Sequence, residues 1–128
     1  MSVEKLRNNP MMNRLLDALD EERDIGHYGR LVFTIVARHF LSDDELIERL
    51  CRDPDVDAAK AKGLLRQVEE ADYSPPGPDT IRGYDEQQSF RILAHPDSPD
   101  AGNVYQDLTF PDDVYESIRA YHEQRAEA

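Results

Sequence analysis

Basic side chains occur at helical spacing in the most apolar part of the chain, DIGHYGRLVFTIVARHFLSDDEL at residues 24–46. Residues three or four apart lie on the same side of a helix, so this stretch predicts one polar strip on an otherwise apolar helix. The strip consists of His27, Arg30, Thr34 and Arg38. It holds two guanidinium groups and one imidazole but no acid, and guanidinium groups favour bidentate contacts with phosphate. The pattern indicates an anion or phosphate site.

A structural interpretation explains the same arginines. The formal net charge is −12, so carboxylates on another helix are available to pair with Arg30 and Arg38. On this helix alone the structural interpretation is preferred, because short motifs without context often arise by chance. Arg66 poses the same question, since Glu69 and Glu70 follow it at a spacing that permits ordinary surface ion pairs.

Few other residues have the side-chain types and spacing that a stacking, metal or catalytic site requires. Tyr73, directly before SPPGP, is either a core aromatic or a stacking platform, and taken singly the core is preferred. One cysteine, Cys51, excludes an internal disulfide, which favours a reducing cytoplasm. The four histidines lack metal-ligand spacing, and no nucleophile–base pair or glycine-rich phosphate loop is present. The sequence predicts no metal site and no catalytic activity.

Helices must position these side chains. Apolar periodicity and capping residues predict helices over 11–24, 25–41, from Ser42 to a stop at Pro54, over 57–71 and over 111–128. The prolines of YSPPGP end regular structure, and residues 74–110 are predicted to form a long irregular segment with at most a short helix in 79–90. No stretch alternates as a strand does. The prediction is one all-α domain, residues 1–128, of about five helices with the irregular segment packed on them.

Size and charge limit the class of protein. A chain of 128 residues suits a single core, and it has neither an apolar run long enough to span a membrane nor a signal-peptide pattern. Residues 1–66 hold 11 Lys and Arg against 13 Asp and Glu, whereas residues 67–128 hold 4 against 14. Acidity of this kind is typical of a solubility or high-salt adaptation. Because most of the excess acid lies in residues 67–128, that half is expected to repel nucleic acid. Residues 1–66 can present a local basic face.

Four stretches, read in order, resemble the C-terminal helical domain of archaeal and eukaryotic primase large subunits. NNPMMNRLLDAL is similar to the family's opening motif and first helix, and GHYGRLVFTIVARHFLSDDELIERL to its helix with a His, an Arg and a long apolar run. DPDVDAAKAKGLLRQVEEADY resembles the next turn and helix, and YSPPGP the aromatic followed by PPSC. The similarity covers about residues 9–88 in register.

The chain departs from that family at its cysteines. The family binds a [4Fe–4S] cluster through four cysteines, and three of them fall near Met11, Pro78 and Gln87 here. The resemblance therefore points to a variant without the iron–sulfur cluster, like the small accessory primase subunit of some archaea, with no cofactor. Apolar residues are then expected to hold the segment 79–110 instead of the cluster; the candidates are Phe90, Ile92, Tyr105, Leu108 and Phe110.

The resemblance also implies a nucleic-acid site. In the family, the His and Arg of the second helix and an Arg late in the fourth engage the template–primer junction and the 5′-triphosphate of the initiating nucleotide. The corresponding residues here are His27, Arg30 and Arg66, to which helical spacing and the aromatic–PP context add Arg38 and Tyr73. With this context, phosphate binding by the strip becomes the preferred interpretation.

The expected function is that of a non-catalytic accessory subunit of a DNA primase or primase-polymerase. It would act in the cytoplasm, away from membranes, with the catalytic protein, single-stranded DNA template and primer 5′ end as partners. The alternative is a helical interaction module that docks a replication or polymerase partner without binding nucleic acid itself, which the acidic second half favours.

Overall fold

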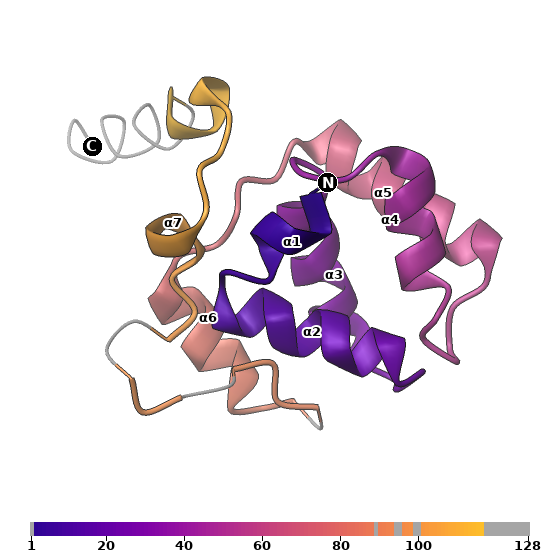
Figure 1. Cartoon of the computed structure of the whole chain (residues 1–128), viewed down its shortest axis with the longest axis horizontal. Helices are drawn as coiled ribbons and strands as arrows, with labels where there is room; N and C mark the ends of the chain where they lie inside the picture. The colour runs from indigo at the N-terminus through magenta and orange to yellow at the C-terminus, as the bar shows by residue number, and fades with distance from the viewer. Residues whose placement is uncertain (1, 89, 94–95, 99–100, 117–128) are drawn as a thin grey trace.

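The computed structural model describes residues 2–88, 90–93, 96–98 and 101–116. Within these residues the chain is all-α, as predicted, and contains no strand (Figure 1). The helices are α1 (Ser2–Leu6), α2 (Pro10–Asp20), α3 (Gly26–Ala37), α4 (Asp43–Leu50), α5 (Ala58–Ala71), α6 (Pro78–Asp85) and α7 (Val104–Asp107). None of the described helices is long and apolar enough to cross a membrane.

Capping side chains begin the helices where the sequence predicts. Asn9 accepts a hydrogen bond from the Met12 amide at the start of α2, and Pro10 occupies the first turn, where its missing N–H costs little. At α4, Ser42 and Glu45 form the predicted capping box. Asp57 caps α5 by accepting from the Lys60 amide. These caps fix the register of the helices that carry the core.

Helices α2 to α5 pack against one another, and α6 and α7 lie beside α2 and α3 on the other side (Figure 1). Apolar stripes of these helices meet in one core, in which Phe33 of α3 is the largest fully buried side chain. The fully buried core also includes Leu15, Leu16, Leu19, Val36, Leu46 and Leu50. Burial of these stripes holds the short helices together, because helices of this length are marginal alone in water.

Several helix predictions need correction. Helix α3 ends at Ala37, and residues 38–40 form turns, so the predicted helix over 25–41 is too long. Helices α1 and α7 were not predicted, because five and four residues are too few for a periodic pattern. Of the helix predicted over 111–128, residues 112–116 are helical and the rest lie outside the described residues.

The segment 74–110 packs on the helices through the apolar residues proposed for that role. Phe90, Ile92, Leu108 and Phe110 are buried, and Tyr105 is partly buried against the core. The segment is more regular than predicted, because it contains α6 and α7. The Tyr105 hydroxyl donates a hydrogen bond to the Pro75 carbonyl, which joins the end of the segment to its beginning.

A buried carboxylate organises the chain after α6. Asp85 is fully buried at the end of α6, where it accepts hydrogen bonds from the amides of Ile92 and Leu93 at 2.6 and 3.4 Å. Arg91 pairs with the same carboxylate at 2.7 Å. Asp85 therefore satisfies backbone groups that have no helix or strand to bond with.

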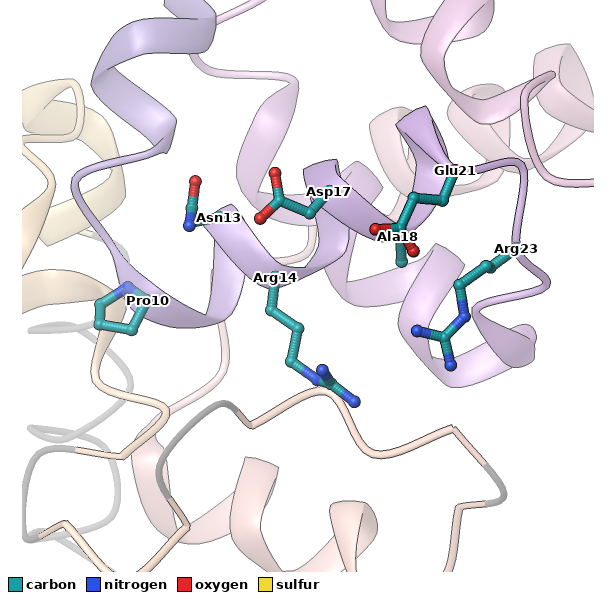
Figure 2. Close-up of a pocket in the computed structure, with 7 residues that line it drawn as sticks. All are labelled: Pro10, Asn13, Arg14, Asp17, Ala18, Glu21 and Arg23. Atoms are coloured by element: carbon teal, nitrogen blue, oxygen red, sulfur yellow. The ribbon is translucent and has the colours of Figure 1, made fainter.

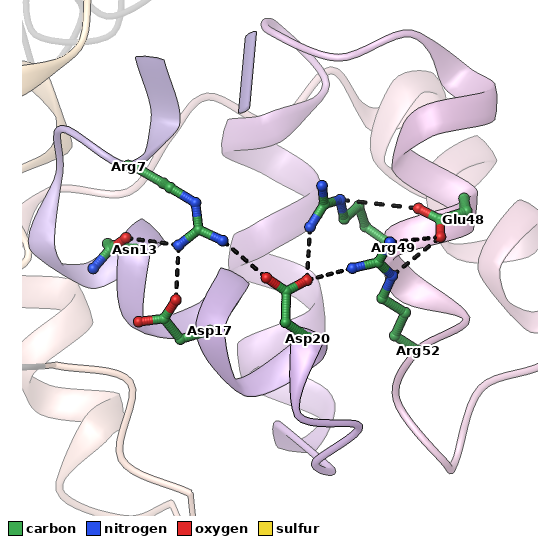
Figure 3. Close-up of polar contacts among 7 residues, drawn as sticks. All are labelled: Arg7, Asn13, Asp17, Asp20, Glu48, Arg49 and Arg52. Atoms are coloured by element: carbon green, nitrogen blue, oxygen red, sulfur yellow. Dashed lines mark hydrogen bonds and ion pairs between the residues drawn. The ribbon is translucent and has the colours of Figure 1, made fainter. Parts of the chain in front are cut away.

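A network of ion pairs links the ends of α1, α2 and α4 on the surface (Figure 3). Arg7 pairs with Asp17 at 2.7 Å and with Asp20 at 2.9 Å. Asp20 also pairs with Arg49 and Arg52 of the α4 region, and Arg52 reaches Glu48. Because the network joins three segments, it restrains their relative positions more than isolated surface pairs do.

Candidate functional site

A mainly apolar hollow lies between α3, the segment after α5 and α6. It has a volume of about 490 Å³. Its walls include His27, Tyr28 and Leu31 from α3, together with Tyr73 and Tyr84. Ser74, Thr80 and Gln88 add polar groups at its edges. A concave, mainly apolar site with a few polar groups is typical of small-molecule recognition.

Stacked tyrosines form one wall of this aromatic pocket. The rings of Tyr28 and Tyr84 lie 4.9 Å apart between centroids, with 20° between their planes. The Tyr28 hydroxyl oxygen is buried and has no hydrogen-bond partner. Burial, with smaller contributions from Tyr84 and Asp85, raises the pKa of Tyr28 to about 12, so the phenol stays protonated at neutral pH. The wall thus contains a neutral, buried hydroxyl group beneath the stacked rings.

Two of the predicted site residues, far apart in sequence, line the same pocket. His27 is exposed at the start of α3, and Tyr73 is 44% exposed just after α5. Tyr73 and Tyr84, which is 52% exposed, are the large hydrophobic side chains most open to solvent among the described residues. The preference for Tyr73 as a core aromatic is therefore wrong, and a stacking role remains open to it.

Arg30 does not lie on an open strip. Its residue is 6% exposed, and its guanidinium contacts Asp24 and Asp53 at 3.1 Å and Asp55 at 3.5 Å. Thr34 is fully buried as well, with its hydroxyl donating to the Arg30 carbonyl at 2.8 Å. The strip fails to face solvent because this side of α3 packs against α5. Pairing with carboxylates from elsewhere, the structural alternative, accounts for Arg30.

Arg38 also pairs with a carboxylate, at the opposite end of α5. Its guanidinium lies 2.8 Å from Asp72 and donates to the Tyr73 carbonyl at 3.2 Å. Asp55 and Asp72 lie just before and just after α5, so the two arginines of α3 bracket that helix. Arg38 thereby positions the backbone of Tyr73, which lines the aromatic pocket.

Arg66 lies on the solvent side of α5. It is exposed and forms no ion pair with Glu69, Glu70 or any other described residue. It lines neither the aromatic pocket nor the smaller adjoining hollow of about 160 Å³. His27, Arg30 and Lys60 line that smaller hollow, so His27 is shared between the two. The structure thus brings His27 to both hollows, Tyr73 to one and Arg30 to the other, and leaves Arg66 apart.

The sequence did not indicate Tyr28 and Tyr84 as site residues. Tyr28 stands beside His27, but on a helix adjacent residues point in different directions, so the spacing argument passed over it. Tyr84 belongs to α6, which is too short for a convincing periodic pattern. Their stacking joins α3 to α6 and depends on the tertiary fold.

The described residues offer no cluster of metal ligands and no activated thiol. They contain no group of three or more His, Cys, Asp or Glu that could hold a metal ion. Met11, at the first cysteine position of the resembled family, is buried in the core. Burial raises the pKa of the Cys51 thiol, which disfavours the reactive thiolate.

No family model, curated protein or solved structure matches the chain.

Proposed function

We propose that this chain is a non-catalytic accessory subunit of a DNA primase or primase-polymerase that binds template DNA and the 5′ end of the primer. The observation that carries the proposal is the aromatic pocket, whose walls include His27 and Tyr73. The resemblance to the primase domain implies a nucleic-acid role for His27, and the aromatic–PP context adds Tyr73. The order of motifs over residues 9–88 supplies the link to primases.

The pocket suits a flat base better than it suits a bare phosphate. A nucleobase offers a π-face to Tyr73 and polar edges to Thr80 or Gln88. Stacking of this kind tolerates any base, which is appropriate to priming on varied templates. The base of the initiating nucleotide is the proposed occupant.

The phosphates of that nucleotide must lie where positive charge remains. His27 adjoins both hollows, and the Arg30 guanidinium lies at the edge of the smaller one. Three carboxylates already surround Arg30, so its principal proposed role is to hold the start of α3 and thereby His27 in place. Arg66 is exposed and forms no ion pair with the residues that the structure describes, which leaves it available for the template backbone.

Fluorescence anisotropy with a labelled primed template tests the proposal. The primer carries either a 5′-triphosphate or a 5′-hydroxyl, and salt is varied from about 0.05 to about 0.2 M. The protein should prefer the triphosphate, and binding should weaken as salt rises. Equal affinity for both ends, or no binding to either, would count against a primer-end site.

Matched variants locate the binding. Tyr73→Ala should weaken binding to the primer end by roughly tenfold, the loss expected for one stacked base. Tyr73→Phe keeps the ring and should bind nearly as well as the wild type. Arg66→Ala should weaken binding and reduce its salt dependence, whereas Lys5→Ala, an equal charge change at an exposed residue of α1, is the control.

A second candidate function is docking of a replication or polymerase partner without nucleic-acid binding. The neutralisation of Arg30 and Arg38 by carboxylates favours it, since the strip then presents little net positive charge. It predicts a stable complex with a basic partner and no salt-sensitive DNA binding. The anisotropy measurement separates the two functions.

A further inference from the structure

A second hollow lies along α2, away from the aromatic pocket. It has a volume of about 370 Å³, and Arg14 and Arg23 extend into it from α2 and from the turn after it (Figure 2). Asn13, Asp17 and Glu21 also line it. It shares no lining residue with the aromatic pocket.

An aromatic ring holds the two arginines close together. The guanidinium carbon of Arg14 lies 4.8 Å from the centre of the Phe90 ring, and that of Arg23 lies 5.0 Å from it. Arg14 is fixed further by donating from Nε to the Arg91 carbonyl at 2.6 Å. Contact with a ring and with a backbone carbonyl orients these guanidinium groups but cancels none of their charge.

Neither guanidinium forms an ion pair among the residues that the structure describes. This distinguishes them from most of the arginines that the structure describes; Arg7, Arg30, Arg38, Arg49, Arg52, Arg82 and Arg91 all pair with carboxylates. Two guanidinium groups without a carboxylate partner at one hollow make it locally positive, which favours an anion there.

The surrounding polar groups narrow the class of ligand. Asn13 extends from the side of α2 opposite Arg14, where its carbonyl accepts from Arg7 at 2.8 Å, so the guanidinium groups of Arg14 and Arg23 are the donors to consider (Figures 2 and 3). Asp17 extends away from Arg14 and is paired with Arg7 (Figures 2 and 3). Glu21 is exposed at the rim and carries the one uncompensated negative charge of the lining. A compact oxyanion with several acceptor oxygens fits these donors, whereas a long polyanion would meet Glu21.

We propose that Arg14 and Arg23 form a binding site for a phosphate group, oriented by Phe90 and separate from the aromatic pocket. The group can belong to inorganic phosphate, pyrophosphate or a small phosphorylated molecule, and each oxygen would accept charge-assisted hydrogen bonds from the guanidinium groups. The proposal stands independently of the primer-end proposal, because the two hollows use different residues.

Titration with inorganic phosphate and with pyrophosphate, followed by NMR of the arginine Nε–H groups and by calorimetry, tests this site. Saturable shifts at Arg14 and Arg23 are expected. Arg23→Gln should weaken binding by about tenfold, the effect of losing one hydrogen bond to a charged group, and should keep the fold because Arg23 is exposed. Lys5→Gln, an equal charge change at an exposed residue of α1, should leave affinity unchanged.

Several results of these titrations would contradict the proposed phosphate site. No saturable shift at these two arginines, or equal weakening by Arg23→Gln and Lys5→Gln, would overturn the site. Parallel titration with a phosphate-free carboxylate, acetate, distinguishes a phosphate site from a general anion site, and equal affinity for acetate would also contradict the proposal. Shifts at His27 instead of Arg14 would assign phosphate binding to the primer-end site alone.

Discussion

Arg30 shows how a single residue can look functional in sequence and prove structural in the fold. Its guanidinium satisfies Asp53, which is fully buried and also accepts from the Ile25 amide at 3.0 Å. The pair therefore fixes the start of α3, where His27 is carried. A buried charge without its partner is costly, so this role is testable by substitution.

Substitution of Arg30 should destabilise the protein strongly. Arg30→Met leaves the Asp53 carboxylate buried and unpaired, and we expect the free energy of unfolding to fall by about 3–5 kcal/mol in urea denaturation. Arg66→Met, at an exposed and unpaired site, should change it by less than about 0.5 kcal/mol. Adding Asp53→Asn to Arg30→Met should restore part of the loss. Wild-type stability of Arg30→Met would contradict this role.

His39 should make stability depend on pH. Burial first, and the neighbouring Arg38 second, lower the pKa of His39 below its ordinary value of 6.5, although Asp113 and Asp72 act in the opposite direction. The unfolded chain then takes up a proton at His39 at higher pH than the folded protein does. Stability from this group is complete above pH 6.5 and falls as pH decreases through the interval below it.

The measurement is urea denaturation of the wild type and of His39→Gln at about pH 7.5 and about pH 5.5. The wild type should lose more stability than the variant between the two conditions. The comparison isolates His39, because the two proteins differ at that residue alone. An equal loss in both proteins would show that His39 does not contribute.

At the scale of elements, α6 and the chain after it depend on one carboxylate. Asp85→Ala removes the acceptor for the Ile92 and Leu93 amides and the partner of Arg91. We expect a loss of about 2 kcal/mol from the unsatisfied buried amides, with faster hydrogen exchange at Ile92 and Leu93. Asp79→Ala, at an exposed position in the first turn of α6, is the control and should leave exchange at those amides unchanged.

Element positions were predictable wherever local signals agree. The caps at Asn9, Ser42 and Asp57 and the apolar stripes of α2, α4 and α5 placed these helices within a few residues. Helix α3 was predicted to extend past its actual end at Ala37, and its polar strip was assigned to solvent. A periodic pattern of apolar and polar residues suggests that the polar side chains face solvent. It cannot show that α5 packs against the strip, or that carboxylates just before and just after α5 pair with its arginines.

The candidate site was predictable only in part, for a related reason. His27 and Tyr73 were indicated by residue type and motif context, and they do share a pocket. The ring stack between Tyr28 and Tyr84 depends on how α6 folds back on α3, which no local pattern encodes. The second hollow likewise depends on Phe90 reaching Arg14 and Arg23 across a long stretch of chain.

Considered as a whole molecule, the protein carries a formal charge of −12, concentrated in residues 67–128. Self-repulsion of this charge opposes the compact state, and salt screens it. The surface ion pairs are screened too, but exposed pairs contribute little individually. Repulsion should therefore dominate the response to salt.

The melting temperature should rise when sodium chloride is increased from about 0.1 M to about 1 M, since the screening length falls from about 10 Å to about 3 Å. The variant with Glu69→Gln and Glu70→Gln, two exposed residues without ion pairs among the described residues, should show a smaller rise. A melting temperature that falls with salt would mean that the ion-pair networks outweigh the repulsion.

The same charge bears on how the protein could meet DNA. Its acidic half would keep duplex away and face a basic catalytic partner, while contact with a primer end would be confined to the aromatic pocket and the exposed cations near it. Binding to nucleic acid is thus expected to be local, with few phosphate contacts and a shallow dependence on salt.

The most direct measurement is an NMR titration of isotope-labelled protein with a primed template whose primer carries a 5′-triphosphate. The largest shifts should occur at His27, Tyr73 and Tyr84, and they should be much smaller with a 5′-hydroxyl primer. Absence of shifts, or shifts confined to the far side of α2 and α4, would contradict the assignment of the aromatic pocket to the primer end.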